Sequence, residues 1–150
     1  MRNLSNHESG IWSSLFIIVL TSVYFFSKVL GAMAAGTPLP VDELYRLGLA
    51  LVFIIVAAEI ALQVTLAIAC RKKERTDERD ALIAAKGARN AYYVLVTGLA
   101  LLGGHAALNR IFGRGLEIDL STAIVFVLLA LVIAEIFHFA SQLYYYRRGV

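Results

Sequence analysis

The chain has 150 residues, of which 59% are hydrophobic and 17% are charged, with a formal net charge of +3. This apolar fraction exceeds the about 45–50% that is usual for soluble domains, which excludes a water-soluble globular protein and indicates an integral membrane protein. The small positive charge sits beside the ends of the apolar runs, so it does not indicate nucleic-acid binding.

Four apolar runs follow one another along the chain, at residues 11–30, 47–70, 91–112 and 120–143. Each has about the 20 residues that a spanning helix needs. Runs of this length without alternation of polar and apolar residues predict helices rather than barrel strands. We therefore expect an all-α protein, a four-helix transmembrane bundle that forms a single domain over residues 1–150.

The basic residues predict the orientation, because cytoplasmic loops carry the excess of Lys and Arg. With four spans, one side holds Arg2, Arg71, Lys72, Lys73, Arg75, Arg79, Lys86, Arg89, Arg147 and Arg148, and the other holds Lys28, Arg46, Arg110 and Arg114. This distribution predicts that both termini are cytoplasmic. A cleaved signal peptide over residues 1–34 is the alternative for the first run, because Ala32-Met33-Ala34 resembles a cleavage site. The length of that run favours a membrane span.

The two halves of the chain align without a gap when residue n is placed on residue n+76. The matched pairs are Glu59 with Glu135, Thr21 with Thr97, Leu44 with Leu120, and Arg71-Lys72 with Arg147-Arg148. The sequence thus predicts two tandem two-helix hairpins, at about 11–72 and about 87–148, joined by a cytoplasmic loop at 71–90. Two copies with the same topology imply a pseudo-twofold axis along the membrane normal.

Small and weakly polar residues recur along the first and third runs. Ser14, Thr21 and Lys28 are spaced by seven residues, which returns to nearly the same helix face. Ala100 and Gly104 form a small-xxx-small pair of the kind that lets membrane helices approach closely. We interpret both patterns as packing seams, with Lys28 reaching toward the outer interface.

Acidic and polar residues inside the second and fourth runs are the candidate functional residues. Glu59 and Gln63 share one helix face, and Glu135, His138 and Gln142 share another. Both acids lie about 18 Å from the cytoplasmic edge at 1.5 Å per residue, so they are expected at the same depth. Two interpretations stay open, which are protonated carboxyls that stabilise helix packing, and a proton or cation pathway through these five side chains.

A metal site is the third interpretation of the same residues. Glu135-x-x-His138 is half of the ligand pattern found in di-iron helix bundles. The equivalent triplet after Glu59 ends at Leu62 and supplies no second histidine. Glu59, Glu135 and His138 are therefore only weak metal candidates, and neither a bound metal nor another cofactor is expected.

The loop at 71–90 is dense in charges of both signs. Thr76 or Asp77 is expected to cap the helix that continues into the third run. The loop residues are candidates for binding anionic lipid or a partner protein, and they are Arg71, Lys72, Lys73, Asp77, Glu78, Arg79, Asp80, Lys86 and Arg89.

The segment DERDALIAAKGARNAYYVL, residues 77–95, resembles a pattern of small uncharacterised bacterial membrane proteins. In that pattern D-E-R-[DEQ]-x-x-[IL]-x-x-K leads into a tyrosine-containing span. The resemblance covers about 20 residues and brings no activity with it. It implies a multi-pass protein of the bacterial inner membrane.

These features favour a non-enzymatic membrane accessory or scaffold protein, acting through helix association and its charged loop. We expect a homo-oligomer or a complex with a membrane partner protein, with anionic lipids at the cytoplasmic face. A small proton or cation channel using Glu59 and Glu135 is the alternative, and a metal-dependent membrane enzyme is the second alternative.

Overall fold

A computed structural model of the chain describes residues 6–37, 39–69, 78–113 and 118–148. Within these ranges the side chains at 6, 7, 62, 63 and 66–69 are also outside the described part. The backbone of the described residues is helical apart from short turns and caps.

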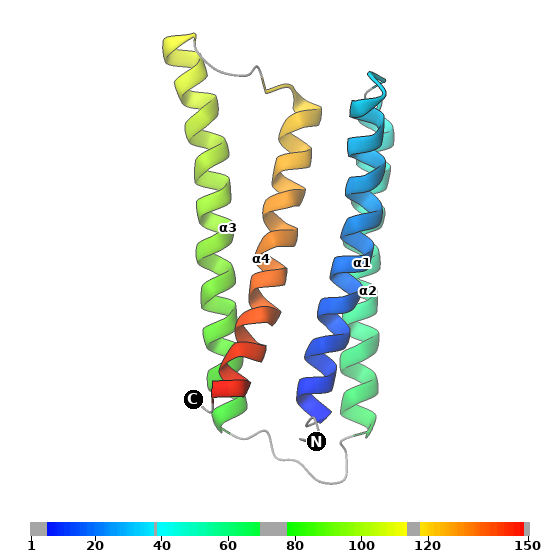
Figure 1. Ribbon diagram of the computed structural model, residues 1–150, viewed down its shortest axis with the longest axis vertical. Coiled ribbons are helices and arrows are strands. Elements are labelled where there is room, and N and C mark those ends of the chain that lie inside the picture. The colour runs from blue at the N-terminus through cyan, green and yellow to red at the C-terminus, as the bar shows by residue number, and fades with distance from the viewer. Residues whose placement is uncertain (1–5, 38, 70–77, 114–117, 149–150) are drawn as a thin grey trace.

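Four helices make up the described chain (Figure 1). They are α1 (Asn6–Ala34), α2 (Val41–Ala69), α3 (Glu78–Phe112) and α4 (Leu120–Arg148). Each is long and apolar enough to cross a membrane. A helix of 29 residues, the length of α1, α2 and α4, is about 43 Å long at 1.5 Å per residue, which exceeds the about 30 Å of the hydrocarbon core. These findings confirm the all-α class and the four apolar helices.

Glycines end the first and third helices. Gly36 has a φ of 69°, and the amides of Gly36 and Thr37 donate to the carbonyl oxygens of Met33 and Ala32, at 3.1 Å in both cases. This is the hydrogen-bond pattern of a Schellman motif. Gly113, with a φ of 61°, donates its amide to the carbonyl oxygen of Asn109 at 2.9 Å and closes α3 in the simpler left-handed cap.

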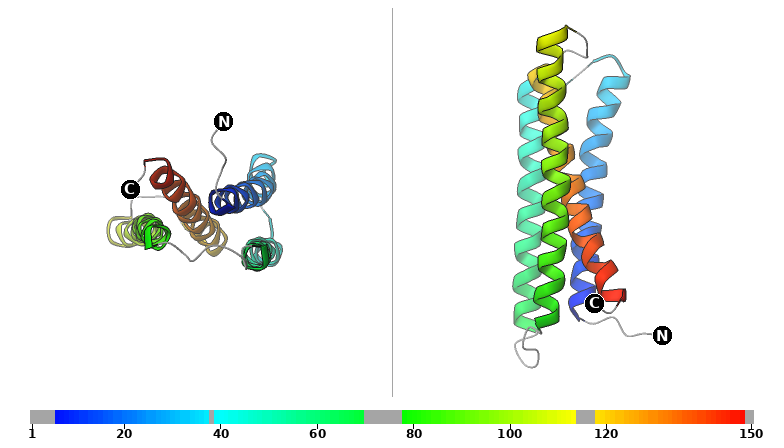
Figure 2. Two further views of the ribbon diagram at one scale, coloured as in Figure 1. Left: turned by 90° about the horizontal axis from the view of Figure 1, so that it is seen from below. Right: turned by 90° about the vertical axis from the view of Figure 1, so that its left-hand side faces the viewer.

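The fourth helix is the central element of the arrangement. In the described ranges α4 packs along α3 on one side and along α1 on the other, with a short contact to α2, and α1 also packs along α2. Seen along the helices, α2 and α3 lie on opposite sides of α4 (Figure 2), and no contact joins them in the described residues. Among the described residues the bundle is therefore open between α2 and α3, and α3 contacts only α4.

The predicted pseudo-twofold relation between the hairpins is not confirmed by this arrangement. The contact of α1 with α4 would require an equal contact of α3 with α2, and none occurs among the described residues. The repeat and the orientation in the membrane stay predictions. The end of the molecule where α1 and α3 begin and α4 ends is called the terminal end (Figure 1).

Buried apolar side chains gather in two clusters along α4. The cluster farther from the terminal end joins α1, α2 and α4 through Phe25, Val29, Leu44, Leu51, Leu128 and Val132. The cluster nearer the terminal end joins α1 and α4 through Ile11, Ile18, Phe139 and Leu143. Within the described part, the hydroxyl of Ser22 is buried on the same face of α1 without a hydrogen-bond partner.

The predicted seam on α1 is correct only at Ser14, which is buried. The hydroxyl of Thr21 donates to the carbonyl oxygen of Ile17 in its own helix at 2.7 Å. Lys28 is exposed, with its ammonium 6.0 Å from the ring centroid of Tyr24. The buried stripe of α1 contains Ile11, Ile18, Phe25 and Val29 together with the small residues Ser14 and Ser22.

Glycines let α3 approach α4 closely. A Cβ atom on Gly87 would lie 2.7 Å from Cγ of Gln142 and 3.0 Å from the backbone oxygen of His138. One on Gly98 would lie 3.0 Å from the Cβ of Ala130. The predicted close approach at Ala100 and Gly104 is not used inside the chain, since Ala100 is exposed and a Cβ on Gly104 would meet nothing within 4 Å.

Candidate functional site

The two predicted intramembrane acids, Glu59 and Glu135, lie on helices α2 and α4, which share a short contact. Glu135 and His138 are one turn apart on α4, and Nδ1 of His138 lies 3.6 Å from Oε2 of Glu135. The carboxyl of Glu59, on α2, lies within electrostatic range of both groups. Helices α2 and α4 thus bring together three of the five residues predicted for the proton pathway. Their role in conduction stays a prediction.

The histidine is held by its neighbours on two helices. Its ring stacks on Phe139, with 4.9 Å between ring centroids and 24° between ring planes. On the α3 side, Cδ2 of His138 lies 3.0 Å from where a Cβ on Gly87 would be. Gln142 is buried at the same contact. The absence of a side chain at Gly87 therefore makes room for both His138 and Gln142.

The acid cluster, which consists of Glu59, Glu135 and His138, is only partly buried by the rest of the chain. The side chain of Glu135 is 46% exposed and that of His138 is 26% exposed. Glu59 is half-buried. An acidic group that faces lipid at mid-depth costs about 2.5–3.5 kcal/mol, so this side of the molecule is unfavourable as a lipid-facing surface.

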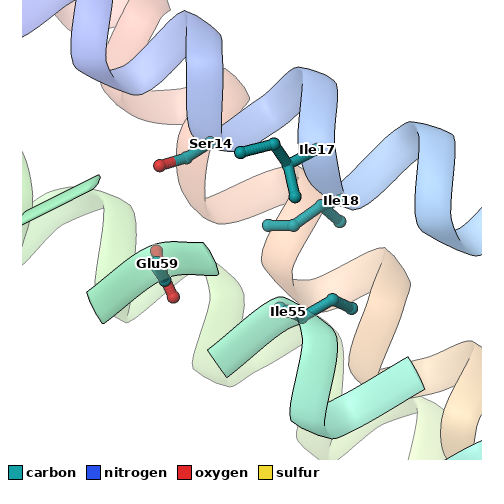
Figure 3. Close-up of a pocket in the computed structure, with 5 residues that line it drawn as sticks. All are labelled: Ser14, Ile17, Ile18, Ile55 and Glu59. Atoms are coloured by element: carbon teal, nitrogen blue, oxygen red, sulfur yellow. The ribbon is translucent and has the colours of Figure 1, made fainter. Parts of the chain in front are cut away.

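A small cavity lies beside Glu59, between α1 and α2. Its volume is about 10 Å³ and its lining residues are Ser14, Ile17, Ile18, Ile55 and Glu59 (Figure 3). That volume is close to the smallest that holds one water molecule. The seven-residue spacing predicted Ser14 as a packing residue, but the sequence carried no signal that places its hydroxyl at the acid site.

A second polar cluster lies at the terminal end, where α3 begins and α4 ends. The hydroxyl of Tyr146 donates to Oδ1 of Asp80 at 2.7 Å, and the guanidinium of Arg79 donates to the backbone oxygen of Tyr146 at 3.5 Å. The ammonium of Lys86 lies 5.1 Å from the ring centroid of Tyr145. Half-buried Asn90 donates its amide to the hydroxyl of Ser141 at 3.1 Å.

Several predicted partner-binding residues are thus engaged inside the chain. Arg79, Asp80 and Lys86 contact the tyrosines of α4, while Glu78 and Arg89 are exposed. The other partner-binding candidates, Arg71, Lys72, Lys73 and Asp77, lie outside the described residues. The side chain of Gln63, a candidate for the proton pathway, is also outside the described part.

Metal coordination gains no support from the geometry. Among the described residues, no group of three or more His, Cys, Asp or Glu side chains is placed to hold a metal ion. Protein metal sites take several such ligands at about 2 Å. Glu59, Glu135 and His138 do not form such a group in the described part of the chain.

Comparison with known proteins gives no match to a family model, a curated protein or a solved structure.

Proposed function

We propose that the chain is a non-enzymatic membrane scaffold that works as a homo-oligomer in the bacterial inner membrane, with both termini in the cytoplasm. The observation that carries the proposal is the 46% exposure of the Glu135 side chain near the middle of α4, which runs from Leu120 to Arg148. A second copy that covers this side of α4 removes the carboxyl from lipid. It also supplies helix surface with which the protonated group hydrogen-bonds.

The open face of α3 supports association between copies. Gly103 and Gly104 have nothing within 4 Å of an added Cβ, and Ala100 and Ala107 are exposed beside them. Faces of this composition allow the backbones of membrane helices to approach one another closely. We propose that the partner is a second copy of this chain, because most soluble oligomers are homo-oligomers with closed symmetry. Each copy carries both the exposed face of α3 and the acids, so two copies supply both surfaces.

The test is the association of the protein in liposomes at decreasing ratios of protein to lipid. Copies labelled with donor or acceptor dyes at Cys70, the one cysteine of the chain, report association by Förster transfer. Glu135→Leu removes one interhelical hydrogen bond worth about 0.6–2 kcal/mol, so the dissociation constant is expected to rise about 3- to 30-fold. Glu135→Gln keeps hydrogen-bonding capacity and is expected to associate like the wild type.

The matched control is Glu43→Leu, which makes the same change at an exposed position in the first turn of α2. It is expected to leave the dissociation constant unchanged. A wild type that stays monomeric at every lipid ratio, or equal association of the Glu135→Leu variant, refutes the proposal.

A proton or cation pathway is the second candidate, and one observation favours it. The Glu59 carboxyl is within electrostatic range of Glu135 and His138, and a cavity of about 10 Å³ lies beside it. Carboxyl, imidazole and water are the groups that relay protons inside membrane proteins. In this reading, Glu59 and Glu135 share a proton, and His138 and Gln142 connect them to the terminal end.

Proton and monovalent-cation flux into liposomes tests the second candidate. Wild-type protein is compared with the double variant Glu59→Gln, Glu135→Gln, after circular dichroism has shown equal helix content. Flux in the wild type that disappears in the variant supports conduction. Equal flux in both, or none across a range of pH and imposed voltage, rejects it.

A further inference from the structure

We propose that the terminal end of α4 is a binding site for the phosphate of an anionic membrane lipid, formed by Arg147 and Arg148 on an aromatic platform. The site is distinct from the acid cluster and does not depend on the oligomeric state. Its ligand class is the phosphodiester headgroup of a lipid, of which phosphatidylglycerol is the simplest anionic probe.

Aromatic rings hold the two guanidinium groups in place. The guanidinium carbon of Arg147 lies 5.8 Å from the ring centroid of Trp12 on α1, and that of Arg148 lies 4.9 Å from the centroid of Tyr144 on α4. Both distances are within the about 6 Å range of a cation–π contact. Both arginines are exposed, so their N–H groups are accessible to a ligand.

The surrounding charges favour an anion. The basic residues described at this end are Arg79, Lys86, Arg89, Arg147 and Arg148, and the acidic ones are Glu8, Glu78 and Asp80. Asp80 already accepts the hydroxyl of Tyr146, and Lys86 and Arg79 contact the tyrosine segment of α4 from the α3 side. The local balance is therefore positive around the last turn of α4.

The position selects a lipid phosphate over a free anion. Trp12, Tyr144, Arg147 and Arg148 lie at the ends of helices that are long enough to span a membrane, which is the depth where headgroups and aromatic belts occur. Guanidinium groups bind phosphate oxygens with two parallel hydrogen bonds, and a cationic side chain near an anionic membrane surface adds favourable energy. A lipid tethered by its acyl chains at this depth is also at a much higher effective concentration than a soluble phosphate.

Trp12 makes the site directly observable, since it is the only tryptophan of the chain. The full-length protein is reconstituted in bilayers that mix unlabelled phosphatidylcholine with brominated phosphatidylglycerol or brominated phosphatidylcholine. Bromine quenches tryptophan on contact, so the ratio of the two quenching curves gives the headgroup preference at Trp12. We expect phosphatidylglycerol to be preferred by at least about fivefold, the size expected of one arginine at an anionic surface.

The double variant Arg147→Gln, Arg148→Gln is expected to bring the preference close to one. Arg148→Gln alone keeps the contact of Arg147 with Trp12 and is expected to lose only part of it. Arg46→Gln, Arg110→Gln is the matched control, because it removes the same charge from exposed positions at the opposite end and should keep the preference. Circular dichroism checks that each variant is folded.

Three results overturn the proposal. The first is equal quenching by the two brominated lipids in the wild type. The second is a preference that survives in the folded double variant. The third is loss of the wild-type preference when inorganic phosphate is added at constant ionic strength, since this outcome assigns the arginines to a soluble anion rather than a lipid. A preference that resists phosphate and disappears only with Arg147 and Arg148 supports the lipid site.

Discussion

Helix α3 approaches α4 closely at Gly87 but not at Gly103. Replacing each glycine by alanine should therefore have opposite effects on the stability of the protein. In Gly87→Ala the new Cβ lies 2.7 Å from Cγ of Gln142 and 3.0 Å from the backbone oxygen of His138. The glutamine side chain is flexible although it is buried, but the backbone of α4 must shift. Overpacking of this kind costs about 1–3 kcal/mol, and the gain in helix propensity from Gly to Ala returns about 1 kcal/mol. The net expectation is a loss of about 1 kcal/mol.

Gly103→Ala is the matched control on α3. Nothing lies within 4 Å of the added Cβ there, so only the helix-propensity gain remains, and we expect up to about 1 kcal/mol of stabilisation. The two alanine variants should therefore differ by about 2 kcal/mol. Unfolding in mixed detergent and dodecyl sulfate micelles, followed by circular dichroism at a dilution where the chain is monomeric, measures this difference. Equal unfolding midpoints for the two variants would refute the interface geometry.

Three further predictions concern single polar groups. Asp119 accepts hydrogen bonds from the Ser121 hydroxyl and from the backbone amide of Thr122 at 3.1 Å, and these bonds lower the pKa of its carboxyl from 3.8 to about 2, Ser121 contributing most. Because the pKa of Asp119 is lower in the folded state, its capping contribution is complete above pH 4 and is lost as the pH falls through about 2. Amide hydrogen exchange in the first turn of α4 should therefore accelerate over that pH window in the wild type. The Asp119→Asn variant should not show this acceleration. Tyr146→Phe removes the donor to Asp80 and should lower the free energy of unfolding by about 1 kcal/mol, and an effect no larger than that of Tyr144→Phe would contradict the contact. Ser22→Ala removes a buried hydroxyl that has no partner in the described part of the chain and should raise stability by about 1 kcal/mol, whereas a loss would mean that the hydroxyl is bonded.

The number and positions of the helices could be predicted from the sequence because a membrane helix is defined by one property, a long apolar run. The predicted run at 91–112 ends where α3 ends, at Phe112, and the run that starts at residue 120 starts α4. Helices α1, α3 and α4 extend beyond the apolar runs at the terminal end, and α1 and α2 extend beyond them at the opposite end. At the terminal end α3 begins at Glu78 and α4 continues to Arg148, because charged and small residues with good helix propensity keep the backbone bonded.

The faces on which the helices pack could not be predicted in the same way. In a soluble bundle the apolar stripe marks the core, whereas both the packed and the lipid-facing sides of these helices are apolar. Phe16 is 68% exposed, Phe53 75% and Leu101 70%, although their sequence surroundings resemble those of buried Phe25 and Leu51. The hydropathy of the sequence therefore could not predict that, among the described residues, α3 contacts only α4.

The acid cluster was more accessible to prediction than its surroundings. Equal spacing of Glu59 and Glu135 from basic residues predicted to mark the membrane edge places both carboxyls at one depth, which stays a prediction; the structure brings the two within electrostatic range of each other. Ser14 was not assigned to the site, because its distance from Glu59 depends on how α1 crosses α2. The polar contacts of Asp80 and Lys86 with α4 were missed for a related reason, since a charge-rich segment beside a span is usually solvated.

The two proposed functions require different surroundings for Glu135 on α4. A second copy that covers Glu135 removes it from lipid and supplies a partner for a structural hydrogen bond. Conduction requires that protons still reach Glu59 and Glu135, and the polar groups that lead toward the terminal end are His138 and Gln142, of which Gln142 is buried against Gly87. A proton path through Gln142 therefore runs along the contact of α3 with α4 at Gly87. A substitution that tightens or loosens the Gly87 contact should alter flux if the acids conduct, and should alter only stability if they hold copies together.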